Sequence, residues 1–262
     1  MQLRADLFVN SHSRETPPGL PSLAPGELHL WRFSYGDAVS STPSAVCRLL
    51  TADEWQAAGR LIFPDDRARF VLRRAFVRCI LGAYLGTAPQ RVLFGRNRWG
   101  KPMVDNRCSA GLDFNVSHTD DTVLLALTRA AALGVDIVSL HSRIDPEAMA
   151  SVVLGLSERR LLAGAAPPDR KGQFLRLWCR KEACLKALGV GLAVDLTALD
   201  VSEDTIIPGD RIDRRDGDGP WPTLHLQDVS LDPAHRAALA VTAPSAMLSM
   251  EPLLVQWPIG SL

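Results

Sequence analysis

The feature that most constrains this chain is an amphipathic pattern that stops at Gly189. Five apolar residues precede it at helical spacing, and they are Phe174, Leu177, Trp178, Leu185 and Leu188. At about 100° per residue they cover one arc of a helix, and a glycine is a common place for a helix to end. Glu182 and Lys186 lie four residues apart at one edge of that arc. The pattern therefore predicts a carboxylate and an ammonium where a buried helix face meets solvent.

On spacing alone, a surface ion pair is the better interpretation of Glu182 and Lys186. Such pairs contribute only roughly 0.3–0.5 kcal/mol and are common on exposed helix faces. A functional interpretation therefore depends on what the rest of the chain places beside them.

Composition limits the possible partners. Lys plus Arg and Asp plus Glu both number 29 in the 262 residues, so the formal net charge is zero and any anion site must be local. We therefore expect no nucleic-acid partner. The first residues lack a signal-peptide core and no apolar run approaches the roughly 20 residues of a membrane span, which predicts a cytoplasmic protein with no membrane partner. The cysteines form no Cys-x-x-Cys pair, which favours reduced thiols; they are Cys47, Cys79, Cys108, Cys179 and Cys184.

Residue periodicity predicts an α+β fold. A first helix is expected to begin at Thr51, which forms a capping box with Glu54, and a second is expected over 66–85 with a stop at Gly86. A third is expected beyond Ser157, and a fourth carries Glu182. The expected strands cover 28–35, 91–95, 113–117, 122–128, 133–139, 194–203, 221–229, 237–243 and 253–257. Two segments rich in turn residues, 10–26 and 204–220, are expected to form a loose arm and an exposed loop.

The two parts of the chain echo each other, because each has a long amphipathic helix followed by apolar strands. The segment 122–128 resembles 237–242 in its pattern. This similarity predicts a pseudo-dimer of two α+β halves, residues 1–129 and 130–262. The active site is expected in the cleft between them, which is a common place for a site.

The turn that begins at Arg96 carries two arginines and a lysine around Gly100, Lys101 and Pro102. Such a turn can point backbone N–H groups at an anion while its side chains supply positive charge. Taken alone, a solvated basic turn is the simpler interpretation.

The segment 113–118 is a second candidate. Strand alternation places Asp113, Asn115 and Ser117 on one face. His118 follows at the strand end, where a structural hydrogen bond is the commoner role and a ligand contact is the alternative. The sequence places no His or Cys partners at zinc-ligand spacing, which excludes a zinc site here.

Asp136 is the hardest residue to explain as solvated surface, because it interrupts the apolar strand 133–139. A buried carboxylate is costly unless it is paired or bound to a metal, and a salt bridge with an arginine is the structural alternative. Together with Glu182 it could hold Mg²⁺, which takes carboxylate, phosphate and water oxygens. The residues that would complete a polyphosphate pocket are Arg96, Lys101, His118 and Lys186. The set predicts phosphoryl or phosphodiester transfer through positioning and charge neutralisation.

Several motifs occur in a fixed order along the chain. They are Gly-Lys-Pro at 100–102, Phe-Asn-Val-Ser-His at 114–118, Gly-Val-Asp at 134–136 and Trp-Cys-Arg-Lys-Glu-Ala-Cys-Leu-Lys-Ala-Leu-Gly at 178–189. In this order they resemble the 4'-phosphopantetheinyl transferases, most closely the larger single-chain class typified by the surfactin-synthetase activator. The resemblance covers about 69–192 and is weaker outside it.

The resemblance implies an enzyme with two similar α+β halves about a pseudo-twofold axis. It implies transfer of the phosphopantetheine arm of coenzyme A to a serine of an acyl or peptidyl carrier protein, with release of adenosine 3',5'-bisphosphate. It also implies a monomer.

Residue roles follow from the same resemblance. Asp136 and Glu182 correspond to Mg²⁺ ligands, and Glu182 also to the base on the carrier serine, directly or through a water. Lys186 corresponds to the group that contacts the phosphates and stabilises charge on the leaving oxygen. The positions that correspond to coenzyme A contacts are Arg96, Gly100, Lys101, Pro102, Asn115, Ser117 and His118, with Arg69 at a helix position that contacts the nucleotide phosphates.

Val138 departs from the family pattern, since many relatives carry a second carboxylate two residues after the first. We therefore predict Mg²⁺ held by two protein carboxylates, the coenzyme A pyrophosphate and water. Val138 is also the only sequence support for the alternative, a coenzyme A or nucleotide-binding protein without catalysis; a scaffold without a ligand leaves Asp136 unexplained. The helix face with Arg73, Arg74 and Arg78 is either a dock for an acidic carrier or a solvated surface.

Overall fold

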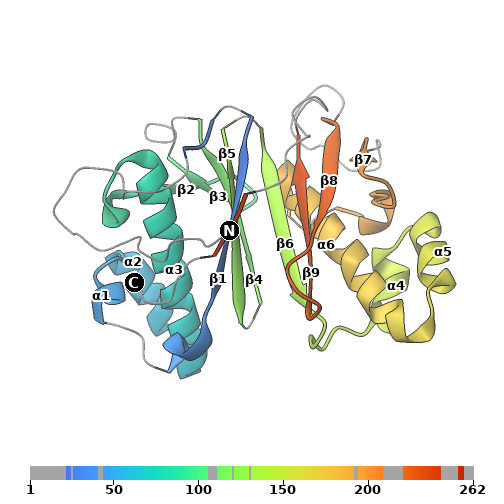
Figure 1. The fold of residues 1–262 in the computed structure, drawn as a ribbon, viewed down its shortest axis with the longest axis horizontal. Coiled ribbons are helices and arrows are strands. Elements are labelled where there is room, and N and C mark those ends of the chain that lie inside the picture. Colours follow the sequence, from blue (N-terminus) through green and yellow to red (C-terminus); the bar gives the residue numbers. More distant parts are fainter. Residues whose placement is uncertain are drawn as a thin grey trace, which may run out of the picture.

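In the residues that it describes, the computed structural model has two four-stranded β-sheets packed face to face, each with a long helix on its outer side (Figure 1). It describes residues 22–24, 26–40, 44–105, 111–119, 121–129, 131–191, 194–208, 221–242 and 253–256. The mixture of helices and sheets confirms the predicted α+β class. The expected arm at 10–26, the loop at 204–220 and Cys108 lie wholly or mostly outside the described residues.

The first sheet has the strand order β10-β1-β5-β4. Its strands are β1 (Leu28–Ser34), β4 (Asp113–His118), β5 (Thr122–Thr128) and β10 (Leu253–Gln256). The helices beside it are α1 (Ser44–Cys47), α2 (Ala52–Gly59) and α3 (Pro64–Leu85), and a two-stranded hairpin is formed by β2 (Phe94–Arg96) and β3 (Pro102–Val104). The strand β10 pairs in parallel with β1, so a segment late in the sequence completes the sheet that an early segment begins.

The second sheet has the strand order β6-β9-β8-β7. Its strands are β6 (Leu133–Ser139), β7 (Thr205–Ile206), β8 (Leu224–Val229) and β9 (His235–Val241). The helices α4 (Pro146–Val153), α5 (Leu156–Gly164) and α6 (Arg170–Leu188) belong to this part of the chain, and α6 lies against β6 and β9. The helix α6 ends at Gly189 in the left-handed conformation (φ 69°), as the sequence predicts.

A shared apolar layer joins the two sheets. The strands β1 and β5 contribute Leu30, Leu124 and Ala126, and they meet side chains of β6 and β9 that include Val135 and Leu239. Every residue of β5 is buried, because α3 covers one face of its sheet and the second sheet covers the other. This double cover explains why 122–128 is a largely apolar run, and cover on both faces of 133–139 leaves Asp136 as the one charged residue within it. The predicted bounds of both strands are confirmed.

The strand predicted over 194–203 is wrong. A short 3₁₀ turn (Leu196–Ala198) lies there instead, and the Asp195 carboxylate accepts the N–H of Thr197 at 2.9 Å. The backbone carbonyls of Leu196 and Leu199 accept from the buried Lys181 ammonium. Side chains therefore satisfy this backbone in place of a neighbouring strand.

The strand predicted over 91–95 begins only at Phe94, because a 3₁₀ turn (Pro89–Arg91) precedes it. The Arg78 guanidinium donates to the carbonyls of Pro89 and Val92. Arg78 is itself buried and pairs with Glu54 at 2.7 Å. The interpretation of Arg78 as part of a solvated or docking face is therefore wrong, because a guanidinium so enclosed by its own chain is closed to a partner.

The helix α4 has no counterpart among the predicted elements. Asp145 caps it by accepting the N–H of Glu147 at 2.9 Å, and Pro146 occupies its first position. This Asp-Pro-Glu sequence is a start signal that could have located the helix. Within the described residues, none of the helices has the length and apolarity that crossing a membrane requires.

Candidate functional site

Side chains of β4 bond to the backbone edge of β6, and this contact joins the two sheets. The pairs are Leu133 N–H to Asp113 Oδ2 (3.0 Å), Val135 N–H to Asn115 Oδ1 (2.9 Å) and Ile137 N–H to Ser117 Oγ (3.4 Å). The alternation of β4 sends every second side chain to β6, and the partner N–H groups also alternate. We call these six residues the β4–β6 seam.

Two lysines satisfy carbonyl groups on the same edge of β6. The Lys101 ammonium donates to the Leu133 carbonyl at 2.9 Å and lies 3.2 Å from Asp113 Oδ2. The Lys186 ammonium donates to the Val135 carbonyl at 3.1 Å. The hairpin that carries Lys101 and the helix α6 that carries Lys186 thus approach the seam from two directions.

Asp136 is buried, and its ion-pair partner is a lysine, whereas the structural alternative raised from the sequence was an arginine. The Lys186 ammonium lies 2.6 Å from Asp136 Oδ1, and the Ser117 hydroxyl donates to the same oxygen at 2.7 Å. Lys186 also donates to Ser117 Oγ at 3.0 Å. The carboxylate, the ammonium and the hydroxyl therefore form one polar group drawn from β4, β6 and α6.

Gly134 allows α6 to approach β6 closely enough for this arrangement. A Cβ atom at residue 134 would lie 2.0 Å from the Ala183 carbonyl oxygen and 2.9 Å from Cβ of Lys186. Only glycine permits that contact. The close approach of α6 places Lys186 over Asp136, which lies two residues after Gly134 on the strand.

Glu182 lies one helical turn before Lys186 and is half-buried. Burial raises the pKa of Glu182, the charge of Asp136 raises it further, and the charge of Lys186 opposes them. A carboxyl group whose ionisation is disfavoured by burial and by a neighbouring carboxylate is typical of a site for a cation or for proton transfer.

His118 ends β4 beside positive charges. Although part of its surface reaches solvent, burial of the ring and the charges of Arg73 and Lys186 lower the pKa of His118 to about 4. The imidazole is therefore neutral near pH 7, and the surrounding charge favours an anion at this end of the strand.

The predicted basic turn is the hairpin loop between β2 and β3. Gly100 adopts a positive φ of 88°, and Arg96 donates to the Gly100 carbonyl at 2.9 Å. Pro102 begins β3. Arg69, near the start of α3, pairs with Asp66 at 3.4 Å, a contact that is separate from the seam.

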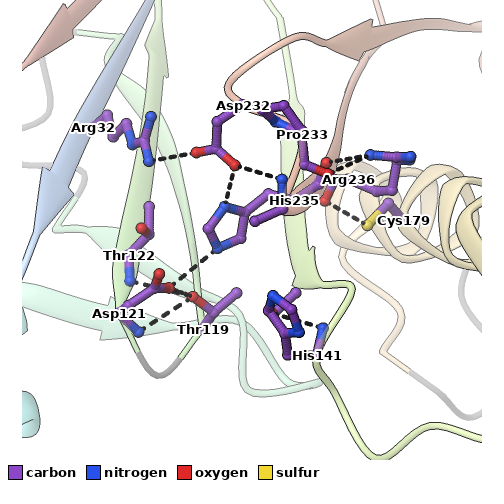
Figure 2. A network of polar contacts seen from close by, with 12 residues as sticks. Arg32, Thr119, Asp121, Thr122, His141, Cys179, Asp232, Pro233, His235 and Arg236 are labelled. Carbon is purple, nitrogen blue, oxygen red and sulfur yellow. Dashed lines mark hydrogen bonds and ion pairs between the residues drawn. The ribbon is translucent and has the colours of Figure 1, made fainter.

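A second polar network joins the sheets beyond the end of the seam (Figure 2). The buried His235 ring lies between Asp232 (Nδ1 to Oδ1, 2.8 Å) and Asp121 (Nε2 to Oδ1, 3.1 Å). Arg32 of β1 contacts the other oxygen of Asp232 at 2.7 Å. We call these four residues the His235 clamp; sequence interpretation did not single it out.

Known proteins match both parts of this chain. A model of the 4'-phosphopantetheinyl transferase superfamily matches residues 132–241, and one of the N-terminal part of 4'-phosphopantetheinyl transferases matches 37–130. The 4'-phosphopantetheinyl transferase HetI of Nostoc sp. is 36% identical over 178 residues, which cover 68% of this chain and 74% of HetI.

The chain belongs to the 4'-phosphopantetheinyl transferases. It is therefore an enzyme of the transferase class, and the predicted family is confirmed. The 4'-phosphopantetheinyl transferase psf-1 of Bacillus pumilus is 30% identical over 74% of this chain and 80% of its own length. The 4'-phosphopantetheinyl transferase gsp of Aneurinibacillus migulanus is 29% identical over 57% of this chain and 60% of its own.

The structure brings five of the eleven predicted phosphopantetheinyl transferase residues to the seam. Lys101, Asn115, Ser117, Asp136 and Lys186 share it or bond to it directly. Their assigned roles toward coenzyme A and metal remain predictions.

Sequence interpretation missed Asn97 and overlooked Lys181. Asn97 bonds to the end of α6 (Nδ2 to the Gly189 carbonyl, 2.9 Å). Lys181 is adjacent to Glu182 but faces the other way, buried against Glu158 at 2.7 Å. No local pattern signals these contacts, because each partner is distant in sequence.

Proposed function

We propose that this protein transfers the 4'-phosphopantetheine arm of coenzyme A to a serine of an acyl or peptidyl carrier protein and releases adenosine 3',5'-bisphosphate. The observation that supports it most is the polar group of Asp136, Lys186 and Ser117, with Glu182 one helical turn away. Family membership supplies the reaction class. Among these residues, Glu182 would be the base and Lys186 the cation, and Ser117 lies near the end of β4, where an anion would bind. The two sheets with their helices would be the halves of a pseudo-dimer, with the site in the cleft between them.

The residues present fit a bound Mg²⁺. Asp136 and Glu182 offer two carboxylates, and burial together with the charge of Asp136 raises the pKa of Glu182, so a cation beside them would favour the ionised form. Among the described residues no group of three or more His, Cys, Asp or Glu side chains is arranged to hold a metal ion, so the protein itself offers few ligands. Such a site is typical of Mg²⁺, which is often held by one or two carboxylates with phosphates and water. When bound, the ion would neutralise charge on the pyrophosphate.

The chemical step is a displacement at phosphorus. The carrier serine oxygen bonds to the phosphorus that bears pantetheine, and the bond from that phosphorus to the oxygen of the adenosine bisphosphate breaks. Glu182 accepts the serine proton, directly or through a water, and its raised pKa suits that role. The Lys186 ammonium stabilises the charge that develops on the leaving oxygen.

A labelling assay tests this function. The protein is incubated with fluorescent coenzyme A, Mg²⁺ and a panel of apo-carrier domains, and covalent label on the carrier is measured. We expect labelling by the natural protein and a loss of at least about 100-fold in Glu182→Gln and Lys186→Ala. Glu203→Gln, at an exposed side chain, should label normally.

Each failure has a distinct meaning. Coenzyme A binding without label on any carrier supports the non-catalytic alternative, and no binding excludes both. Lys186→Ala leaves the buried Asp136 carboxylate without its ammonium partner, which destabilises the fold. The double variant Lys186→Ala/Asp136→Asn removes that unpaired charge. Circular dichroism of both variants then shows whether loss of label comes from loss of fold. Normal labelling by Glu182→Gln would contradict its assigned role.

A further inference from the structure

Asn97 lies in the hairpin loop and uses both ends of its side-chain amide. Its Oδ1 accepts the backbone N–H groups of Trp99 and Lys101, both at 2.9 Å. Its Nδ2 donates to the carbonyl of Gly189 at 2.9 Å. The opposite amide orientation would turn the NH₂ group toward two donors, so the chemistry of the partners fixes this one.

The contact between Asn97 and Gly189 joins elements of the two parts of the chain. Gly189 ends α6, and a Cβ atom there would lie 2.7 Å from Asn97 Nδ2 and 3.7 Å from Cδ of Lys101. The loop is therefore packed directly against the end of the helix.

The two linked elements carry the residues that face the seam. The loop carries Lys101, whose ammonium lies on the Leu133 carbonyl. The helix carries Glu182 and Lys186, and Lys186 lies on the next carbonyl of the same edge, that of Val135. The spacing between the two ammonium groups depends on how the loop sits against α6.

We propose that Asn97 is a positioning residue that holds the Lys101 loop against the end of α6, so that both lysines meet the phosphates of one coenzyme A molecule. The inference rests on the proposed function, because it assumes that this molecule is the substrate. The Oδ1 contacts shape the turn, and the Nδ2 contact couples it to the helix. These two tasks can be separated by substitution.

Asn97→Asp separates them. A carboxylate keeps an acceptor for Trp99 and Lys101, loses the donor to Gly189 and places negative charge against that carbonyl. We expect KM for coenzyme A to rise about three- to tenfold, the range for one hydrogen bond, with a smaller change in kcat. Calorimetric titration with coenzyme A and Mg²⁺, without carrier, should show the same loss of affinity.

A purely structural role predicts a different result. A destabilised protein would lose active molecules, which lowers apparent kcat and leaves KM for coenzyme A unchanged. Asp145→Asn is the matched control, since it makes the reverse exchange in a turn that caps α4 and should leave both constants unchanged.

A double-mutant cycle tests the contact from the helix side. Gly189→Ala directs a methyl group at Asn97 Nδ2 and also strains the left-handed backbone at φ 69°, so it should raise KM and lower the stability of the fold. In Asn97→Ala/Gly189→Ala the clash is gone, and the combined effect should fall short of the product of the single effects.

The outcomes are distinguishable. An unchanged KM and affinity in Asn97→Asp, or independent effects in the cycle, overturns the positioning role while the natural protein still labels carriers. If the natural protein neither binds coenzyme A nor labels a carrier, the proposed function fails first and the positioning role with it.

Discussion

At the scale of single residues, the two lysines of the candidate site already have partners within the chain. Lys186 bonds to Asp136, Ser117 and the Val135 carbonyl, and Lys101 bonds to Asp113. A phosphate that binds here must replace some of these contacts. Without a phosphate, the seam holds the ammonium groups of Lys101 and Lys186 in place. The charge surplus around His118, whose pKa is lowered to about 4, favours that exchange.

Val138 supplies a prediction at this scale. It lies two residues after Asp136 on the same face of β6 and is buried in the apolar cluster around α6. Val138→Glu adds a carboxylate beside Asp136, so we expect activation at lower Mg²⁺ concentration than in the natural protein. Without Mg²⁺ the variant should lose about 1–3 kcal/mol of stability, because the new charge is buried unpaired.

Val138→Gln separates the two effects, because it has nearly the same shape and no charge. Thermal unfolding with and without Mg²⁺ should show both variants destabilised and only Val138→Glu rescued by the ion. The prediction is refuted if the natural protein is activated at the same Mg²⁺ concentration as Val138→Glu or at a lower one.

At the scale of elements, the position of α6 on β6 decides whether the site forms. Gly134 is the point of contact, and a methyl group there meets backbone atoms of α6 at 2.0 and 2.5 Å. Gly134→Ala must push helix and strand apart, which should cost about 3 kcal/mol and separate Lys186 from Asp136. Urea unfolding and the labelling assay check both effects. Gly59→Ala, where a Cβ atom meets nothing within 4 Å, is the matched control.

The same scale explains what the sequence could predict. The strands β5 and β6 were predictable because cover on both faces demands largely apolar runs, which only Asp136 interrupts with a charge, and α6 was predictable because Gly189 marks its end. The segment 194–203 was not, because its backbone partners are the distant side chains of Lys181 and Glu158. For the site, the carboxylates and Lys186 could be grouped from motif order, whereas the pairing of β4 side chains with β6 backbone depends on the packing of two sheets.

At the scale of the whole molecule, three kinds of contact hold the sheets together: the shared apolar layer, the β4–β6 seam and the His235 clamp. The clamp lies beyond the seam, since Asp121 follows β4 and His235 pairs with Ser139 at the end of β6. Its carboxylates respond to pH. Burial raises the pKa of Asp232, but the hydrogen bond and charge of His235 and the contacts with Arg32 outweigh it, so the pKa is lowered.

The pKa of Asp121 is lowered in the same way, with burial opposed by a hydrogen bond from Thr119 and by His235. A carboxylate with a lowered folded pKa stabilises the fold above its unfolded value of about 3.9 and loses that contribution as pH falls through the folded pKa. The clamp should therefore stabilise the contact between the sheets at neutral pH and lose that contribution in acid. Asp232→Asn should cost about 1–3 kcal/mol at pH 7, because Arg32 and His235 lose a charged partner.

Urea unfolding of the natural protein and Asp232→Asn across pH 7 to 3 measures this contribution. The difference between the two proteins should shrink as the pH falls, because protonation removes from the natural protein what the substitution removes from the variant. Asp53→Asn, at an exposed carboxylate in α2, should stay within about 0.5 kcal/mol of the natural protein at pH 7. A difference for Asp232→Asn that stays constant down to pH 3 would show that the clamp acts through shape and packing, with no part for the ionised carboxylate.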